Sequence, residues 1–294
     1  MIYRRVASPL HAARAAVAIA WCAALAVGAL IESNPVLLGA IAVSVVAGGV
    51  LAGVGRELRR SLLWSVPLWL AIGLINALVT RNGLTVIWRL GEIPLVGQTN
   101  ITLEATVYGG VLGLRAVVLV LVGTLYSVAV DPDEVLRMFR GVSFSSALSA
   151  TIATRMVPVL LRDSRRLADA QRCRPGDPPG RAQLLRATTA GVLDRALDVA
   201  ATLEVRGYGA ARRRARGRPH LHHDQRPWSR HDFSFLASAV VLAAVVVGAR
   251  IAGWAAFTAY PLLRAPAGAR TLEVAAVLLV AALAPFLNRR GVQR

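Results

Sequence analysis

The run from residue 105 to residue 130 reads ATVYGGVLGLRAVVLVLVGTLYSVAV, and its one charged side chain is Arg115. A stretch of this length and apolarity can cross the hydrocarbon core of a bilayer, which takes about 20 residues as a helix. Lipid offers no partner for backbone N–H and C=O groups, so such a stretch must be helical. The run therefore predicts a transmembrane helix.

Five further apolar runs repeat this pattern along the 294 residues of the chain. They cover residues 13–31, 36–54, 62–79, 234–257 and 271–287. The chain is 55% hydrophobic and has a mean hydropathy of +0.54, which excludes an ordinary soluble domain. We expect an all-α membrane protein with about six transmembrane helices.

The distribution of arginine predicts how the chain lies in the membrane. The sequence has no lysine, and nineteen of its 34 basic residues fall between residues 131 and 232. Positive charge gathers on the cytoplasmic side of membrane proteins. We therefore expect a multi-pass protein of the cell (plasma) membrane, with both termini and residues 131–232 in the cytoplasm. The same rule accounts for the net charge of +18 without a nucleic-acid partner.

The arginine-rich segment divides the chain into three predicted parts. Residues 1–130 form an N-terminal membrane part with four spans, residues 131–232 a cytoplasmic region, and residues 233–294 a C-terminal membrane part with two spans. Helical periodicity in the middle part predicts two long helices, over 145–174 and 181–206, followed by a solvated linker. The turn-rich stretch 80–104 is expected outside, with a re-entrant or interfacial piece near its apolar residues as one possibility.

Each of the two long helices is expected to end on an arginine. Residues 170–175 read AQRCRP and place Arg174 before a proline, and residues 204–208 read EVRGY and place Arg206 before Gly207. A guanidinium offers a fixed charge and a planar fork of donors, which suits carboxylates or carbonyls in another protein. A cation at a helix C-terminus is also stabilising by itself, by about 0.3–1 kcal/mol. Helix capping is therefore the alternative interpretation.

These motifs resemble those of the transmembrane T component of energy-coupling factor (ECF) transporters, the CbiQ/EcfT-like family. Cys173 and Pro175 stand where that family usually has a small residue and a glycine. The resemblance covers about residues 81–208, and three shorter segments also carry it: 101–105 (ITLEA), 108–110 (YGG) and 155–158 (RMVP).

The resemblance implies a role in coupling to two ABC-type ATPase subunits. Arg174 and Arg206 would dock into grooves of the two ATPases, and ATP-driven closure would move the coupling helices. That motion would help a membrane substrate-binding S component to release its substrate inside. The residues implied in ATPase coupling are Arg174, Arg206, Gln171, Cys173, Glu204 and Gly207. Those implied in the structure of the coupling helix are Arg155, Pro158 and Pro175.

The absence of lysine agrees with this division of labour. The phosphate-binding loop G-x-x-x-x-G-K-[ST] needs a lysine to reach nucleotide phosphates. The chain therefore carries no standard ATP site, no cofactor is expected, and ATP would be bound by the partner subunits. The predicted function is a non-catalytic subunit of an ECF-type importer for a micronutrient, either a vitamin or a transition-metal ion.

Several alternatives stay open at the level of sequence. A membrane adaptor without transport would keep the same arginines. An enzyme like the CDP-alcohol phosphotransferases is suggested by Asp194 and Asp198 after Gly191, although the upstream part of that signature is missing. Arg115 and Arg250 lie inside predicted spans, where a charge is costly; each could snorkel, form an internal pair or act in transport. No metal site is expected, because the histidines at 220, 222 and 223 fit a solvated linker better.

Overall fold

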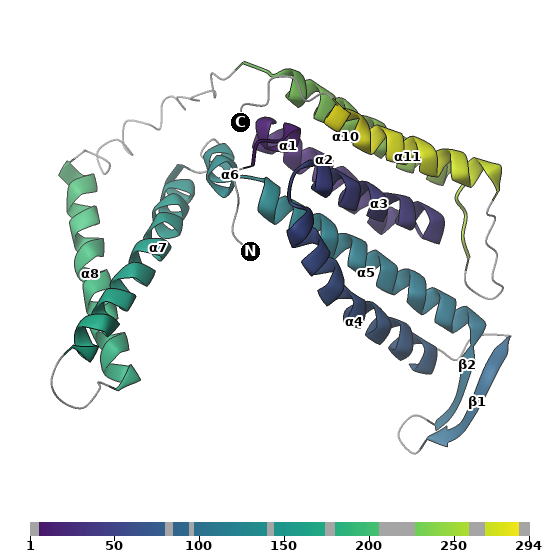
Figure 1. The fold of residues 1–294 in the computed structure, drawn as a ribbon, viewed down its shortest axis with the longest axis horizontal. Coiled ribbons are helices and arrows are strands. Elements are labelled where there is room, and N and C mark those ends of the chain that lie inside the picture. The colour runs from purple at the N-terminus through teal and green to yellow at the C-terminus, as the bar shows by residue number, and fades with distance from the viewer. Residues whose placement is uncertain are drawn as a thin grey trace. The chain divides into compact units, whose positions relative to one another are not determined.

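The structure is a computed structural model that describes residues 6–79, 85–93, 97–139, 144–173, 180–205, 227–258 and 268–287. Over these ranges the chain forms long α-helices and a β-hairpin (Figure 1). It separates into two compact units: residues 1–132 with 227–294, and residues 133–226. We refer to the first as the membrane unit and to the second as the paired-helix unit.

Apolar helices build the membrane unit. The apolar helices are α2 (Ala15–Ile31), α3 (Pro35–Leu51), α4 (Gly55–Val79), α5 (Leu103–Ala129), α10 (Arg230–Ile251) and α11 (Ala269–Leu287). A short helix, α1 (Pro9–Ala12), precedes α2. Among the described residues, α4, α5, α10 and α11 are long and apolar enough to cross a membrane, whereas α2 and α3 are apolar but shorter. Each of the six coincides with a predicted span, so the expected all-α membrane fold is confirmed.

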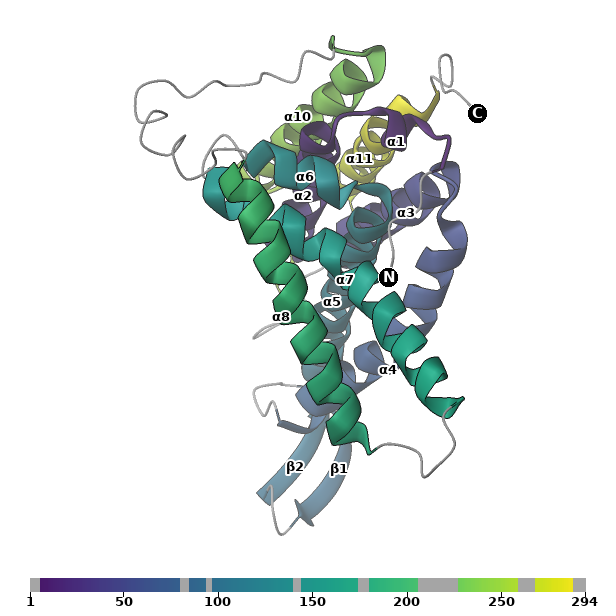
Figure 2. The same cartoon turned by 90° about the vertical axis from the view of Figure 1, so that its left-hand side faces the viewer.

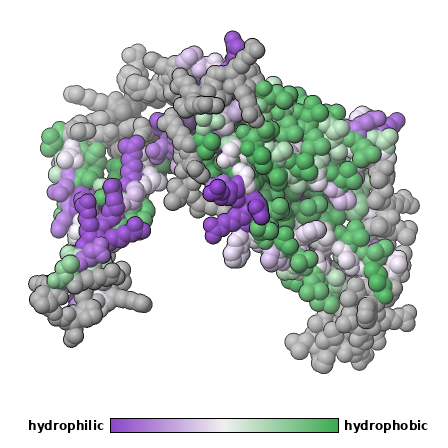
Figure 3. All heavy atoms as spheres, viewed as in Figure 1, coloured by the Kyte–Doolittle hydropathy of each residue, from purple (hydrophilic) through white to green (hydrophobic). Residues whose placement is uncertain are grey.

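The helices of the membrane unit are arranged around α2 and α3. Helix α10 packs on α2 and α11 packs on α3, while α5 contacts both central helices (Figures 1 and 2). Helix α4 packs along α5 at the edge of the bundle and leaves large apolar side chains exposed. Trp64, for example, is 75% exposed. Figure 3 shows that apolar residues dominate the visible face of this unit. Such a surface suits contact with lipid tails.

Three aromatic rings form the centre of the packing between α2, α10 and α11. Trp21, Phe235 and Phe286 are buried, with ring centroids 5.1–5.7 Å apart in edge-to-face geometry. The indole N–H of Trp21 donates to the Ser238 hydroxyl at 3.1 Å, and that hydroxyl donates to the Ala281 carbonyl at 2.7 Å. The cluster therefore joins the N-terminal spans to the C-terminal pair through packing and a chain of hydrogen bonds.

Small residues let α4 and α5 approach closely. A Cβ added at Gly113 would lie 2.3 Å from the Trp69 ring and 3.0 Å from its carbonyl oxygen. The Trp69 ring N–H donates to the Gly110 carbonyl at 2.9 Å, and the Ser61 and Thr124 hydroxyls are 2.7 Å apart. The glycine face of α5 is thus occupied by another helix of the same chain, as is common where helices meet in membranes.

A β-hairpin, absent from the sequence-based expectation, connects α4 to α5. Strand β1 (Val86–Ile93) pairs antiparallel with β2 (Gly97–Thr102), with Ile93 opposite Gly97 and Val86 opposite Thr102. The Thr102 hydroxyl accepts the Ala105 N–H at 3.3 Å and so caps α5. The buried carboxylate of Glu104 accepts the N–H and hydroxyl of Thr85 at 3.2 and 2.9 Å. These bonds fix the base of the hairpin at the start of α5.

The paired-helix unit contains α6 (Pro132–Phe139), α7 (Phe144–Arg172) and α8 (Arg181–Val205). The two long helices agree with those predicted over 145–174 and 181–206, whereas the short α6 was not predicted. The three-part division of the chain stays a prediction.

Candidate coupling site

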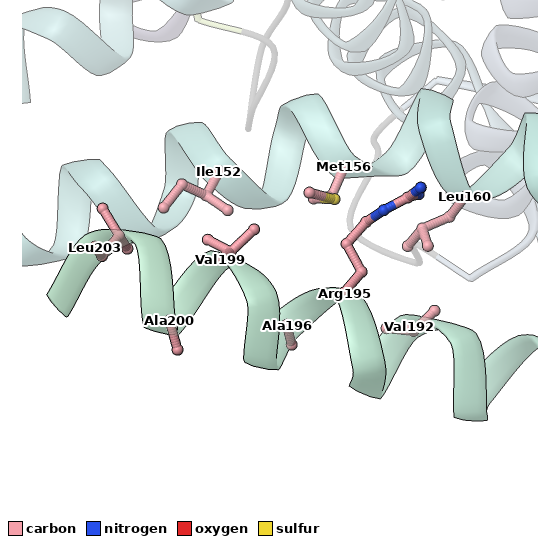
Figure 4. Close-up of a pocket in the computed structure, with 9 residues that line it drawn as sticks. All are labelled: Ile152, Met156, Leu160, Val192, Arg195, Ala196, Val199, Ala200 and Leu203. Carbon is pink, nitrogen blue, oxygen red and sulfur yellow. The ribbon is translucent and has the colours of Figure 1, made fainter. Parts of the chain in front are cut away.

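Helices α7 and α8 run antiparallel and cross at an angle in the paired-helix unit (Figures 1 and 4). In Figure 4, Ile152 of α7 lies opposite Leu203 of α8 at one end, and Leu160 lies opposite Val192 at the other. The apolar spacing of 3 and 4 residues on each helix explains why they pair, since it places one apolar stripe on each. The C-terminal ends of α7 and α8 therefore lie at opposite ends of the pair.

An apolar groove of about 310 Å³ lies between the two helices. One polar side chain, that of Arg195, is among the residues that line it (Figure 4). These residues are Ile152, Met156, Leu160, Val192, Arg195, Ala196, Val199, Ala200 and Leu203. The side chains of the pair thus leave open apolar space between the helices.

The first arginine motif begins in the last turn of α7. Gln171 is helical, although its side chain lies outside the described part of the chain. Cys173 is an exposed, free thiol, and its N–H donates to the Asp169 carbonyl at 3.3 Å. Arg174 and Pro175 lie outside the described residues. Their assigned roles stay predictions. The structure shows that α7 ends at Arg172, two residues before Arg174 in the sequence.

The second motif follows α8 in the same way. Glu204 is an exposed residue in the last turn of this helix, which ends at Val205. Arg206 and Gly207 come next in the sequence and lie outside the described residues. The last two residues of α8 are exposed, and a basic group that follows a helix C-terminus is favoured by the helix dipole.

Arg155 and Pro158 lie in the middle of α7. The Arg155 guanidinium is 3.9 Å from the Asp133 carboxylate of α6, and 73% of the Arg155 side chain and 46% of the Asp133 side chain are exposed. Pro158 is accommodated inside the helix, where it provides no N–H for the carbonyl one turn earlier. Their predicted role in shaping this helix is not tested further by these contacts.

Sequence reasoning missed an ion pair that joins the two helices. The Arg195 Nη1 atom of α8 lies 2.5 Å from the Asp163 Oδ2 atom of α7. Asp163 stands within the arginine-rich run 162–166, so its partner could not be chosen from the sequence.

The groups that suggested other functions lie outside the groove between α7 and α8. Asp194 and Asp198 are exposed on α8, and the described residues hold no group of three or more His, Cys, Asp or Glu that could bind a metal. The three linker histidines lie outside the described part. Arg115 of α5 makes a structural contact, since its guanidinium donates to the Glu32 carbonyl at 2.7 Å and to the Ser33 hydroxyl at 3.2 Å.

Comparison with known proteins shows the family of this chain. The protein-family model described as CbiQ, cobalt transport protein, matches residues 6–216. This range is well over half of the chain and includes α2 to α5 together with α7 and α8. No curated protein matches the sequence.

Proposed function

Because this chain belongs to the CbiQ family of cobalt transport proteins, we propose that it is the non-catalytic transmembrane subunit of an ECF-type ABC importer. The family indicates a membrane permease component rather than an enzyme, and favours cobalt among the candidate micronutrients. In the proposed role, two separate ATPase subunits hydrolyse ATP. The chain passes their movement to a membrane S component that binds the substrate.

The observation that carries this proposal is the antiparallel arrangement of α7 and α8. Their C-terminal ends lie at opposite ends of the pair, and α8 alone, with 25 residues, is about 37 Å long. Arg174 follows one of these ends in the sequence and Arg206 follows the other. Two arginines presented in this way suit two different subunits better than one shared groove.

The mechanical part of the proposal rests on the length of the helices. A helix transmits a displacement along its axis because its backbone hydrogen bonds resist bending, whereas a loop absorbs it. Docking of Arg174 and Arg206 would therefore tie the two ends of the pair to the two ATPases. When the ATPases close on ATP, the pair moves and its motion reaches the membrane part. The positive-inside rule supports a cytoplasmic location for this pair and for both termini.

Co-purification tests the proposed contact directly. The chain is expressed with the candidate ABC ATPases and captured from a membrane extract, as wild type and as Arg174→Glu plus Arg206→Glu. The matched control is Arg165→Glu plus Arg186→Glu, which reverses two exposed charges in the interior of the same helices. We expect wild type and control to retain the ATPases and the first variant to lose them at unchanged helix content.

Two other results would change the interpretation. Equal capture by all three forms would mean that Arg174 and Arg206 serve only as helix caps. Failure of the wild type to capture either ATPase would overturn the proposed function and favour the adaptor.

A further inference from the structure

The ion pair between α7 and α8 is selective in its partner. Asp163 is flanked in the sequence by Arg162, Arg165 and Arg166, all of which are exposed. The Asp163 carboxylate nevertheless pairs across the groove, with Arg195 at 2.5 Å. About 40% of each side chain is exposed, and a pair in such a setting adds little to stability. Its consequence is geometric, because a guanidinium and a carboxylate interact best in a narrow range of orientations.

The position of the pair complements the apolar groove. Arg195 lines the groove with its aliphatic stem, and Leu160, which also lines it, lies three residues before Asp163 on α7. Apolar contact is non-directional, so the residues of the groove can slide past one another at small cost. The ion pair supplies the directional link that this contact lacks.

Pro158 lies inside α7, between the residue that contacts α6 and the residue that forms the ion pair with α8. A proline inside a helix removes one backbone hydrogen bond and favours bending at that point. The half of α7 before Pro158 carries Arg155, which is 3.9 Å from Asp133 of α6. The half after Pro158 carries Asp163, which contacts α8. Both halves of α7 nevertheless pack on α8, because Ile152 and Met156 before the proline and Leu160 after it line the groove. The ion pair adds a directional contact to this apolar packing.

We propose that Asp163 and Arg195 are positioning residues that fix the register of α7 against α8, so that the two helices move as one lever. This inference rests on the proposed function, because the lever is what would carry the Arg174 and Arg206 ends. With the pair intact, movement of one end displaces the other by a fixed amount. Without it, the two helices slide in the groove and the movement is lost.

Spin labels measure this directly on the full-length chain. One label is attached to the exposed native Cys173 at the end of α7, and the second to Ala201→Cys, an exposed site on α8. Cys22 is buried and provides no competing site. The two positions lie near opposite ends of the pair, roughly 30 Å apart along the helices, a separation suited to pulsed electron spin resonance.

The distance distribution is compared in four backgrounds. These are the wild type, Asp163→Asn, the exchange Asp163→Arg plus Arg195→Asp, and the control Asp198→Asn, which changes an exposed carboxylate one turn from Arg195. We expect a narrow distribution in the wild type and control, broadening of about twofold in Asp163→Asn, and a return toward the wild type in the exchange. ATP-dependent uptake of radioactive Co²⁺ by cells that express the complete transporter, without labels, should follow the same order, with ATPase capture unchanged.

The results separate the lever from the proposed function. A distribution in Asp163→Asn as narrow as in Asp198→Asn would overturn the lever, as would broadening that the exchange fails to reverse. Loss of ATPase capture by the wild type would instead overturn the proposed function, while the label distances would still decide whether the pair joins the helices.

Discussion

Arg115 shows how a charged side chain within an apolar run can find polar partners in the same chain. Its guanidinium reaches the connection between α2 and α3, where it donates to the Glu32 carbonyl and the Ser33 hydroxyl at 2.7 and 3.2 Å. Helix α2 ends at Ile31, so the Glu32 carbonyl belongs to the turn that follows. A cation at this position offsets the negative end of the helix dipole. The contact supports the internal-pair interpretation of Arg115.

Loss of this contact should destabilise the membrane unit. We expect Arg115→Gln to lower stability by about 1–3 kcal/mol, because a shorter amide leaves the Glu32 carbonyl without its charged donor. The thermal midpoint of the purified protein in detergent measures the effect. Arg59→Gln, at an exposed site of α4, serves as the control and should leave the midpoint unchanged. An equal decrease in both variants would argue against the structural role.

Glu32 should make the stability of the same region depend on pH. Its side chain is buried, and its Oε1 atom has no hydrogen-bond partner among the residues that the structure describes. Burial raises the pKa of this carboxyl above the ordinary value, and the charge of Arg250 only partly offsets the rise. The folded state therefore holds this proton at pH values where the unfolded chain releases it. Stability contributed by the proton is present below the ordinary pKa, about 4.3, and is lost as pH rises through the raised value.

Glu32→Gln should remove this dependence. We expect the variant to melt at the same temperature as the wild type in acid and at a higher temperature near neutral pH. Thermal midpoints over a pH series test the expectation, with Glu273→Gln, at an exposed site of α11, as the reference. A difference between Glu32→Gln and wild type that does not change with pH would contradict it.

At the scale of elements, the contact between α4 and α5 depends on the absence of a side chain at Gly113. An added Cβ would lie 2.3 Å from the Trp69 ring, within a helix pair that also holds the Ser61–Thr124 contact. Overpacking of this kind costs about 1–3 kcal/mol. We expect Gly113→Ala to lower the thermal midpoint by several degrees. Gly123→Ala on the same helix meets nothing within 4 Å and should leave it unchanged or raise it slightly.

Helices were the predictable elements of this chain, and the reason is physical. Lipid forces each apolar run to satisfy its own backbone, so length and composition determine the structure. The hairpin at 86–102 was not predicted, because Gly91 lies inside its first strand and two register shifts interrupt the pairing of the strands. The contact of Trp69 with Gly110 was likewise invisible, since it depends on the relative rotation of two helices.

The candidate site was predictable in part for a similar reason. The ends of α7 and α8 follow from proline, glycine and the apolar period, and they place both arginine motifs at helix ends. The pairing of Asp163 with Arg195 requires the register between two antiparallel helices, which the sequence of each helix does not contain. Arg174 and Arg206 lie outside the described residues, so their roles rest on the motifs and the family.

At the scale of the whole molecule, the C-terminal spans belong to the same unit as the N-terminal spans. Asp232, at the start of α10, is fully buried and accepts the Arg14 N–H at 2.7 Å across 218 positions of sequence. It also accepts the Ser229 N–H at 2.8 Å, and the Arg14 Nε atom lies 3.7 Å away. The Trp228 ring lies against the Arg14 guanidinium at 5.1 Å. This cluster closes the membrane unit where the chain returns from the paired-helix unit.

Removal of the Asp232 carboxylate should therefore loosen the membrane unit without affecting ATPase contact. Asp232→Ala removes the N3 carboxylate of the capping box at the start of α10 and takes away the carboxylate that accepts the Arg14 N–H, a change worth about 3 kcal/mol. We expect a fall in thermal midpoint of roughly 10 °C, while capture of the ATPases from membrane extracts is retained. Glu273→Ala, an exposed change on α11, should alter neither measurement. If Asp232→Ala abolished capture at an unchanged midpoint, Asp232 would belong to the coupling route rather than to the closure of the membrane unit.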